Sequence, residues 1–258
     1  MDLGLRDKTV LVSGSSHGLG RSIAEGFLGE GANVILTGRD ISLLENAEKR
    51  LRAKSPPGKM LSFAGDLTRP DVIKACLNFA VEHFGRIDVL VANIGSGRGS
   101  IDWNIAEEDW NAMLDLNFNG ARRIATAVLG AMVKQGGGSV VFVSSIAGVE
   151  AIGAPIHYSV AKAALIAYAK NLSRKMADNN IRVNTVAPGN IMFENGTWDR
   201  KLKDDRDGVL AMLRATVPQN RFATPKEISD FIVFVASERG SFMTGSCVIV
   251  DGGQTATI

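Results

Sequence analysis

The stretch that decides the fold runs from Thr9 to Gly20 and reads TVLVSGSSHGLG. Its first four residues are apolar or β-branched, which predicts a buried strand. Gly14, Gly18 and Gly20 follow, and apolar residues then recur at helical spacing up to Leu28. A strand, a glycine-rich turn and a helix in this order present backbone N–H groups and a helix N-terminus to a pyrophosphate. The stretch therefore predicts a dinucleotide site, with an ordinary turn as the alternative.

Short apolar runs recur along the rest of the chain, and segments with helical spacing separate them. This alternation predicts an α/β protein with a single-domain Rossmann fold, a doubly wound parallel sheet of about seven strands with helices on both faces. Because no repeat or linker divides the sequence, we expect one domain over residues 1–258. Pro70 and the group Thr224, Pro225 and Glu227 mark two helix starts. The further expected strands are 33–36, 60–63, 89–92, 139–143, 182–186 and 247–250.

Residues 192–220 break this rhythm. The segment is first polar and charged (FENGTWDRKLKDDRDG) and then briefly amphipathic (VLAMLRA). This pattern predicts an inserted helical flap over a substrate site rather than another strand and helix.

Composition narrows the class of function. Glycine contributes 28 of 258 residues, about 11% against a usual ~7%. The fold therefore needs a residue without a side chain at several positions. A formal net charge of +2 argues against nucleic acid and membrane surfaces as partners and favours a small-molecule substrate. The two cysteines, Cys76 and Cys247, predict neither a disulfide framework nor a metal site. A charged N-terminus and the lack of a long apolar run lead us to expect a cytoplasmic protein.

The glycine spacing is G-x-x-x-G-x-G, and further motifs follow over almost the whole chain. Together they resemble the short-chain dehydrogenase/reductase family in its compact branch. The motifs are Asp66-Leu67, Asn93 with Gly95, Asn117, Ser145, Tyr158 with Lys162, Arg182-Val183-Asn184, Pro188-Gly189 and Asp251-Gly252-Gly253.

This resemblance implies a nicotinamide cofactor. Asp66 and Leu67 would contact the adenine, although Asp66 also suits a turn carboxylate before Pro70. Asn93 and Gly95 would border the nicotinamide ribose. The full set of expected cofactor-binding residues is Gly14, Ser16, His17, Gly18, Leu19, Gly20, Arg39, Asp66, Leu67, Asn93, Gly95, Tyr158, Lys162, Pro188, Gly189 and Ile191.

The end of the second strand indicates which dinucleotide fits. A carboxylate there would bind the ribose hydroxyls and repel a 2′-phosphate, but the sequence reads Leu36, Thr37, Gly38, Arg39. The guanidinium of Arg39 favours a 2′-phosphate, so we expect NADP(H) to be preferred, with NAD(H) still open. The alternative is that Arg39 is a solvated loop charge. His17, as a neutral imidazole, adds little to this preference.

Four residues are expected to be catalytic: Asn117, Ser145, Tyr158 and Lys162. Tyr158 and Lys162 share one helix face, and an ammonium nearby stabilises a phenolate, although a Y-x-x-x-K pair alone also suits an exposed helix. By resemblance, Ser145 would bind the substrate carbonyl, whereas Ser144 would bond to local backbone. Asn117 would help hold a water in a proton relay, or would bond its own helix backbone instead.

The sequence departs from the family pattern at two places. The usual N-N-A-G reads Ala92, Asn93, Ile94, Gly95, and Phe193 stands where many relatives have a threonine that bonds the carboxamide. Ile94, Ser96, Arg98, Glu150, Ile152, Met192, Phe193 and Trp198 are candidates for the substrate pocket.

The resemblance implies hydride transfer between NADP(H) and a carbonyl or secondary alcohol, with Tyr158 as general acid and base. A 3-oxoacyl-[acyl-carrier-protein] reductase-like activity is the first expectation, and an NAD-dependent sugar or secondary-alcohol dehydrogenase is the alternative. A non-catalytic dinucleotide sensor and a sugar-nucleotide epimerase are remoter alternatives. Relatives also lead us to expect a homotetramer or homodimer.

Overall fold

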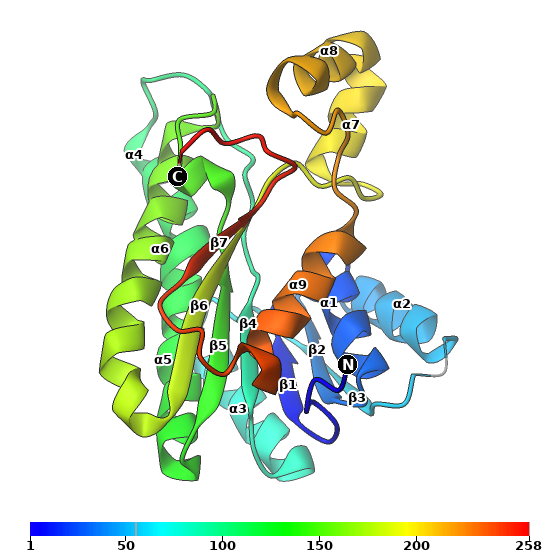
Figure 1. Ribbon diagram of the computed structural model, residues 1–258, viewed down its shortest axis with the longest axis vertical. Coiled ribbons are helices and arrows are strands. Elements are labelled where there is room, and N and C mark those ends of the chain that lie inside the picture. Colours follow the sequence, from blue (N-terminus) through cyan, green and yellow to red (C-terminus); the bar gives the residue numbers. More distant parts are fainter. Residues whose placement is uncertain (55, 258) are drawn as a thin grey trace.

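The structure is a computed structural model that describes residues 1–54 and 56–257. Seven parallel strands form one sheet in the order β3-β2-β1-β4-β5-β6-β7 (Figure 1). The expected doubly wound α/β fold is confirmed, and every expected strand is present to within two residues at each end. The strands are β1 Thr9–Val12, β2 Asn33–Gly38, β3 Met60–Ala64, β4 Val89–Ala92, β5 Gly138–Val143, β6 Ile181–Pro188 and β7 Cys247–Val250.

Helices cover both faces of the sheet, because successive strand residues point to opposite sides. Val10 and Val12 of β1 belong to the core under α1, α2 and α9. Leu11 belongs to the core under α3, α5 and α6. The helices are α1 Gly18–Gly29, α2 Ile41–Arg52, α3 Pro70–Phe84, α4 Glu107–Leu114, α5 Gly120–Gln135, α6 Ile156–Met176, α7 Thr197–Asp204, α8 Arg206–Thr216 and α9 Pro225–Ala236.

The order of the strands places the functional crevice. From β1 the chain proceeds outward to β2 and β3, and it then returns to β4 on the other side of β1. Connections leave β1 and β4 in opposite directions, so a crevice opens at the carboxyl ends of these two strands.

The expected helix starts are confirmed in atomic detail. Pro70 is the first residue of α3. At α9 the Thr224 hydroxyl accepts from the Glu227 N–H at 3.3 Å, and the Glu227 carboxylate accepts from the Thr224 N–H at 2.8 Å. This is the reciprocal capping box that the sequence predicts.

The segment 192–220 contains α7 and α8 and no strand, as expected for a helical flap. The Met192 N–H donates to the Ala223 carbonyl, and the Ala223 N–H donates to the Asn190 carbonyl, each at 2.9 Å. The two ends of the flap are therefore fastened together. Figure 1 shows α7 and α8 projecting beyond the layers of the sheet.

One helical segment differs from its expected form. Asn117 lies within a long helical segment as expected, but the segment takes a π-helical turn over Asp115–Asn119 where α4 passes into α5. Such turns are rare and often occur at functional sites. None of the helices within residues 1–54 and 56–257 combines the length and apolar character needed to cross a membrane.

Candidate active site

The glycine-rich loop forms a cradle at the N-terminus of α1. Gly14 and Gly18 have φ values of +68° and +55°, a region that side chains disfavour. A Cβ at Gly20 would collide with the Gly14 carbonyl oxygen. The residue at the N-cap of α1, His17, makes no side-chain capping bond within the described chain. The first amides of α1 are thus available to an anion, which fits the pyrophosphate of a dinucleotide.

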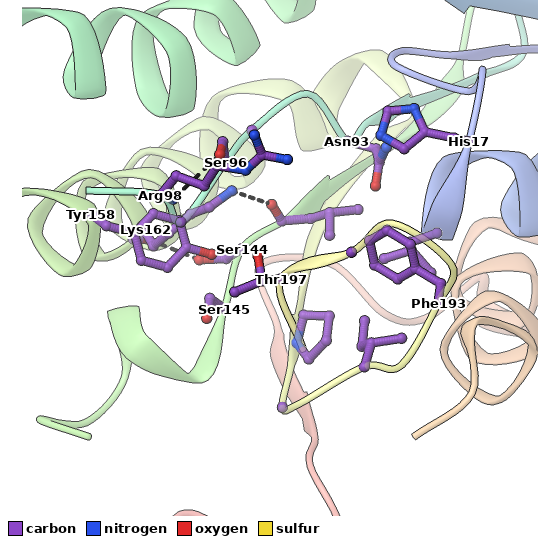
Figure 2. A pocket seen from close by; sticks show the side chains of 18 of the residues that line it. His17, Asn93, Ser96, Arg98, Ser144, Ser145, Tyr158, Lys162, Phe193 and Thr197 are labelled. Atoms are coloured by element: carbon purple, nitrogen blue, oxygen red, sulfur yellow. Dashed lines mark hydrogen bonds between the residues drawn. The ribbon is translucent and has the colours of Figure 1, made fainter. Parts of the chain in front are cut away.

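Two adjoining cavities, of about 420 Å³ and about 250 Å³, lie at the carboxyl ends of the strands. All sixteen residues assigned to the cofactor from the sequence line one or both of them. The larger cavity extends from the glycine-rich loop to Arg39, and the smaller one contains Ser145, Tyr158 and Lys162 (Figure 2). Residues that are far apart in the sequence therefore form one groove.

Arg39 and Asp66 meet at the outer end of this groove. The Arg39 guanidinium lies 4.0 Å from the Asp66 carboxylate, and its side chain is 72% exposed. Asp66 also accepts from the Thr68 N–H at 3.0 Å and from the Thr68 hydroxyl at 2.8 Å. Asp66 is thus a turn carboxylate, the alternative considered for it, while its contact with adenine remains a prediction.

His17 and Asn93 support the glycine-rich loop. Burial lowers the pKa of His17, and the charges of Arg21 and Arg98 lower it further, so the imidazole is neutral at pH 7. The Asn93 amide donates to the carbonyl oxygens of Ser13 and Gly14, both at 3.2 Å. It thereby ties the end of β4 to the loop after β1.

The smaller cavity joins side chains from α6 and from the end of β5. The Lys162 ammonium donates to the Val143 carbonyl at 3.0 Å and lies 5.8 Å from the centroid of the Tyr158 ring. The Ser144 hydroxyl donates to the Lys162 carbonyl at 2.9 Å, so it bonds to backbone as expected, but to that of α6 rather than to a local residue. The Ser145 hydroxyl accepts from the Ala147 N–H at 3.2 Å and keeps its own proton to donate.

Burial dominates the protonation of this pair. It lowers the pKa of Lys162 to about 8. It raises the pKa of Tyr158, and the Ser145 hydroxyl opposes that rise only in part. The sequence had suggested the opposite direction for Tyr158. Because burial holds the pKa of Tyr158 above its ordinary value of 10.0, the phenol is protonated at neutral pH, the form that donates a proton.

Asn117 lies behind the cavities and lines neither of them. Its buried amide donates to the Met113 carbonyl at 3.2 Å, as expected for a helix-interior asparagine. It also donates to the Ser96 carbonyl at 3.1 Å and accepts from the Ser96 N–H at 3.0 Å. A Cβ at Gly95 would lie 2.6 Å from the Asn117 Oδ1 and 3.0 Å from the Lys162 Nζ. Asn117 thus holds the loop against Lys162, and its water relay remains a prediction.

Phe193 lies across the glycine-rich loop. A Cβ at Gly18 would come within 2.7 Å of its ring, whose centroid is 6.5 Å from that of His17. Phe193 lines both cavities, as Figure 2 shows for the smaller one. The ring therefore covers the N-terminus of α1, where the pyrophosphate is expected.

The substrate candidates are divided by the structure. Ile94, Ser96, Arg98 and Phe193 line the cavities, whereas Glu150, Ile152, Met192 and Trp198 do not. The Glu150 carboxylate instead accepts from the Ala256 and Thr257 amides. The flap residues Thr197 and Arg200 line the smaller cavity and were missed. Their polarity was visible in the sequence, but the face of α7 that meets the cavity was not.

Comparisons with known proteins agree with this geometry. A family model described as Enoyl-(Acyl carrier protein) reductase matches residues 14–255. The chain is 35% identical to 3-oxoacyl-[acyl-carrier-protein] reductase FabG of Thermotoga maritima over 250 residues, 96% of this chain and 98% of that protein. It is 35% identical to the FabG of Escherichia coli over 248 residues, 96% of this chain and 97% of that one.

Among solved structures, the L-sorbose reductase of Gluconobacter frateurii, complexed with NADPH and L-sorbose, is similar over the full length of both chains, with 34% identity and a TM-score of 0.93.

A glycine-rich loop at a helix N-terminus, beside a cavity that contains serine, tyrosine and lysine, defines a dinucleotide-dependent oxidoreductase. The chain belongs to the short-chain dehydrogenase/reductase family, and it is an NAD(P)-dependent dehydrogenase/reductase.

The lowered pKa of Lys162 predicts a pH dependence of stability. Between about 8 in the fold and the ordinary 10.5, the unfolded chain binds more protons at this lysine, so the contribution of Lys162 to the free energy of unfolding should rise with pH across this window. Burial raises the pKa of Cys76 from 9.0 to about 12, and this thiol contributes the opposite slope, so the variants are compared with one another. The slope from urea unfolding at several pH values should be more positive in wild type and in the control Lys134→Met, an exposed lysine of α5, than in Lys162→Met. An equal slope in all three proteins would contradict the burial of the ammonium.

The position of Phe193 predicts that its removal strengthens cofactor binding. Phe193→Ala should lower the Kd for NADPH about fivefold, because about 1 kcal/mol of ring burial no longer has to be lost when the ligand binds. Fluorescence titration measures this change, with the fully exposed Phe242 replaced by alanine as the control. Weaker binding by Phe193→Ala would show that the ring supports the bound cofactor instead.

Proposed function

We propose that this protein transfers a hydride between NADP(H) and a carbonyl or secondary alcohol substrate, with Tyr158 as the general acid and base. The observation that carries the proposal is the meeting of Ser145, Tyr158 and Lys162 in one small cavity beside the dinucleotide groove. A protein that only sensed the dinucleotide would have no need of this group.

Each side chain has a role that follows from its position. When bound, the nicotinamide supplies or accepts the hydride. In carbonyl reduction the protonated phenol of Tyr158 donates its proton to the carbonyl oxygen, and in alcohol oxidation the Tyr158 phenolate accepts the proton of the alcohol. The Ser145 hydroxyl donates a hydrogen bond to the same oxygen. Lys162 stabilises the phenolate that remains, and Asn117 and Gly95 position the ammonium.

The preference for NADP(H) rests on Arg39. The segment after β2 supplies a guanidinium at the mouth of the larger cavity and lacks the carboxylate that would repel a 2′-phosphate. The similar L-sorbose reductase was solved with NADPH, which supports the same choice. NAD(H) remains the alternative cofactor.

Two substrate classes have support. Identity of 35% to the FabG proteins favours a 3-oxoacyl thioester, the expectation from the sequence. Similarity over the full length to an L-sorbose reductase favours a ketose, and the polar residues Ser96, Asn195 and Thr197 at the smaller cavity suit hydroxyl groups.

The proposal extends to domain and assembly. Residues 1–258 act as one dinucleotide-binding domain, and the flap over 192–220 covers the substrate. We also propose a homotetramer or homodimer, which the exposed apolar side chains Val133, Ile156 and Val160 of α5 and α6 support.

Removing the phenol hydroxyl tests the general acid. Tyr158→Phe should lower kcat by about 10²- to 10⁴-fold, the usual contribution of a positioned proton donor, and leave the Kd for NADPH within about twofold. The matched control is Tyr168→Phe, at the other tyrosine of the chain, which lies on the same helix and packs against Phe118 and Phe142. Near-normal turnover by Tyr158→Phe would refute the proposed role.

Arg39 tests the choice of cofactor. Arg39→Ala should raise the KM for NADPH about tenfold or more, the effect of one charge-assisted hydrogen bond, and leave the KM for NADH nearly unchanged. Arg69→Ala, at an arginine paired with Asp71 outside the cavities, is the control. Equal use of NADH and NADPH by wild type would contradict the assignment.

A further inference from the structure

In the loop after β4, every second residue is a glycine whose backbone packs against active-site side chains or their neighbours. Its sequence is Gly95-Ser96-Gly97-Arg98-Gly99. A Cβ at Gly97 would lie 3.3 Å from the Tyr158 ring, and one at Gly99 would lie 2.5 Å from the His157 ring. Gly95 contacts Asn117 and Lys162 in the same way. The absence of three side chains therefore lets the backbone lie directly against the catalytic groups.

The two residues between these glycines bring their side chains to the cavities. Ser96 and Arg98 line both cavities, and Figure 2 shows them above Tyr158 and Lys162. The amide and carbonyl of Ser96 are both bonded to Asn117, which fixes the loop next to Arg98. Although the Arg98 side chain is exposed, its backbone is thus placed by the same contacts that position the catalytic lysine.

A second arginine reaches the catalytic cavity from the flap. Arg200 lies on α7, is partly buried, and lines only the smaller cavity. The cavity therefore receives guanidinium groups from two separate elements, the loop after β4 and the flap. Together with the ammonium of Lys162 these make three cationic groups, while the nearby His17 is neutral.

Among the described residues that line the smaller cavity, none is an aspartate or a glutamate. The carboxylate of Asp199, next to Arg200 on α7, does not line the cavity and is paired with Lys203. Neither Arg98 nor Arg200 forms an ion pair within residues 1–54 and 56–257, whereas arginines elsewhere on the surface, such as Arg52 and Arg221, do. Like charges around a small cavity repel one another, and an anion between them would be attracted strongly.

We propose that the substrate is a small carbonyl compound, or the corresponding alcohol, that carries a carboxylate or phosphate bound by Arg98 and Arg200. This inference rests on the proposed function and adds the charge of its substrate. The cavity of about 250 Å³ must also admit the nicotinamide, because several of the residues expected to bind the cofactor line it, so it suits only a short substrate. Ser96, Asn195 and Thr197 suit the hydroxyl groups of that substrate. A guanidinium binds either anion through two parallel N–H groups, so the two sources share one chemistry.

Matched pairs of ketones test the inference, because each pair differs in charge. One pair is L-sorbose and 5-keto-D-gluconate, in which a terminal hydroxymethyl group is replaced by a carboxylate. The other is dihydroxyacetone and dihydroxyacetone phosphate. With NADPH saturating, kcat/KM of the wild type should be at least about tenfold higher for the anionic member of one or both pairs. The pair that shows the preference identifies the anion as carboxylate or phosphate.

Substitutions then assign the preference to the two arginines. Arg98→Gln and Arg200→Gln should each lower kcat/KM for the anionic ketone about tenfold or more, and change that for its neutral partner less than about twofold. The matched control is Arg214→Gln, at an exposed arginine of α8 that lines neither cavity. It should retain the preference of the wild type.

The opposite results overturn the inference. A higher kcat/KM for the neutral members, or a preference that survives both substitutions, would remove the anion site. A rise confined to the KM for NADPH would assign Arg98 to the cofactor phosphates. The proposed function is tested separately, by the turnover of Tyr158→Phe. If no ketone is reduced, each ketone is titrated into the protein with NADP⁺ present, and calorimetry measures its Kd. The anion site is overturned if neither 5-keto-D-gluconate nor dihydroxyacetone phosphate binds more tightly than its neutral partner.

Discussion

The hydrogen bond from the Lys162 ammonium to the Val143 carbonyl, at 3.0 Å, is the interaction on which the site depends. It joins α6 to the carboxyl end of β5, and the bond from the Ser144 hydroxyl to the Lys162 carbonyl reinforces this junction. Burying an ammonium is unfavourable, and the lowered pKa of Lys162 records that cost. The fold thus places a buried ammonium, which has no counter-ion among the described residues, beside the position where the Tyr158 phenolate would form. The proposed proton transfer would supply the negative charge that this ammonium stabilises.

Glycine makes the close packing around this lysine possible. In the loop after β1, Gly14, Gly18 and Gly20 leave room for a pyrophosphate. In the loop after β4, Gly95, Gly97 and Gly99 let the backbone lie against Lys162, Tyr158 and His157. The excess of glycine in the composition therefore has two physical origins, the approach of a ligand and the approach of the chain to its own catalytic helix. The residues between the second set, Ser96 and Arg98, are presented to the cavities as a consequence.

Much of the fold and the candidate site was predictable because the signals are local. A β-branched run defines β7 with the same bounds in sequence and structure. Pro70 marks the start of α3 through its fixed φ, and Thr224 marks that of α9 through hydrogen bonds with Glu227. The residues expected to bind the cofactor line the two cavities, and most of them belong to short motifs next to the end of a strand.

The remaining features depend on contacts between distant segments. The π-helical turn at Asn117 accompanies bonds to Ser96, twenty-one positions earlier. The protonation of Tyr158 follows from burial by several elements, and local spacing to Lys162 suggested the opposite direction. Thr197 and Arg200 reach the smaller cavity only through the way in which the flap packs, which its polar composition did not specify.

The central claim is that one cavity couples hydride transfer to proton donation by Tyr158. The most direct measurement follows deuterium from NADPH labelled at the transferring position of the nicotinamide, with the best carbonyl substrate of the wild type. The account predicts a secondary alcohol with deuterium on the former carbonyl carbon, formed by wild type and by Tyr168→Phe and at a rate at least about a hundredfold lower by Tyr158→Phe. An unlabelled alcohol, or equal rates of labelled product from all three proteins, would contradict it.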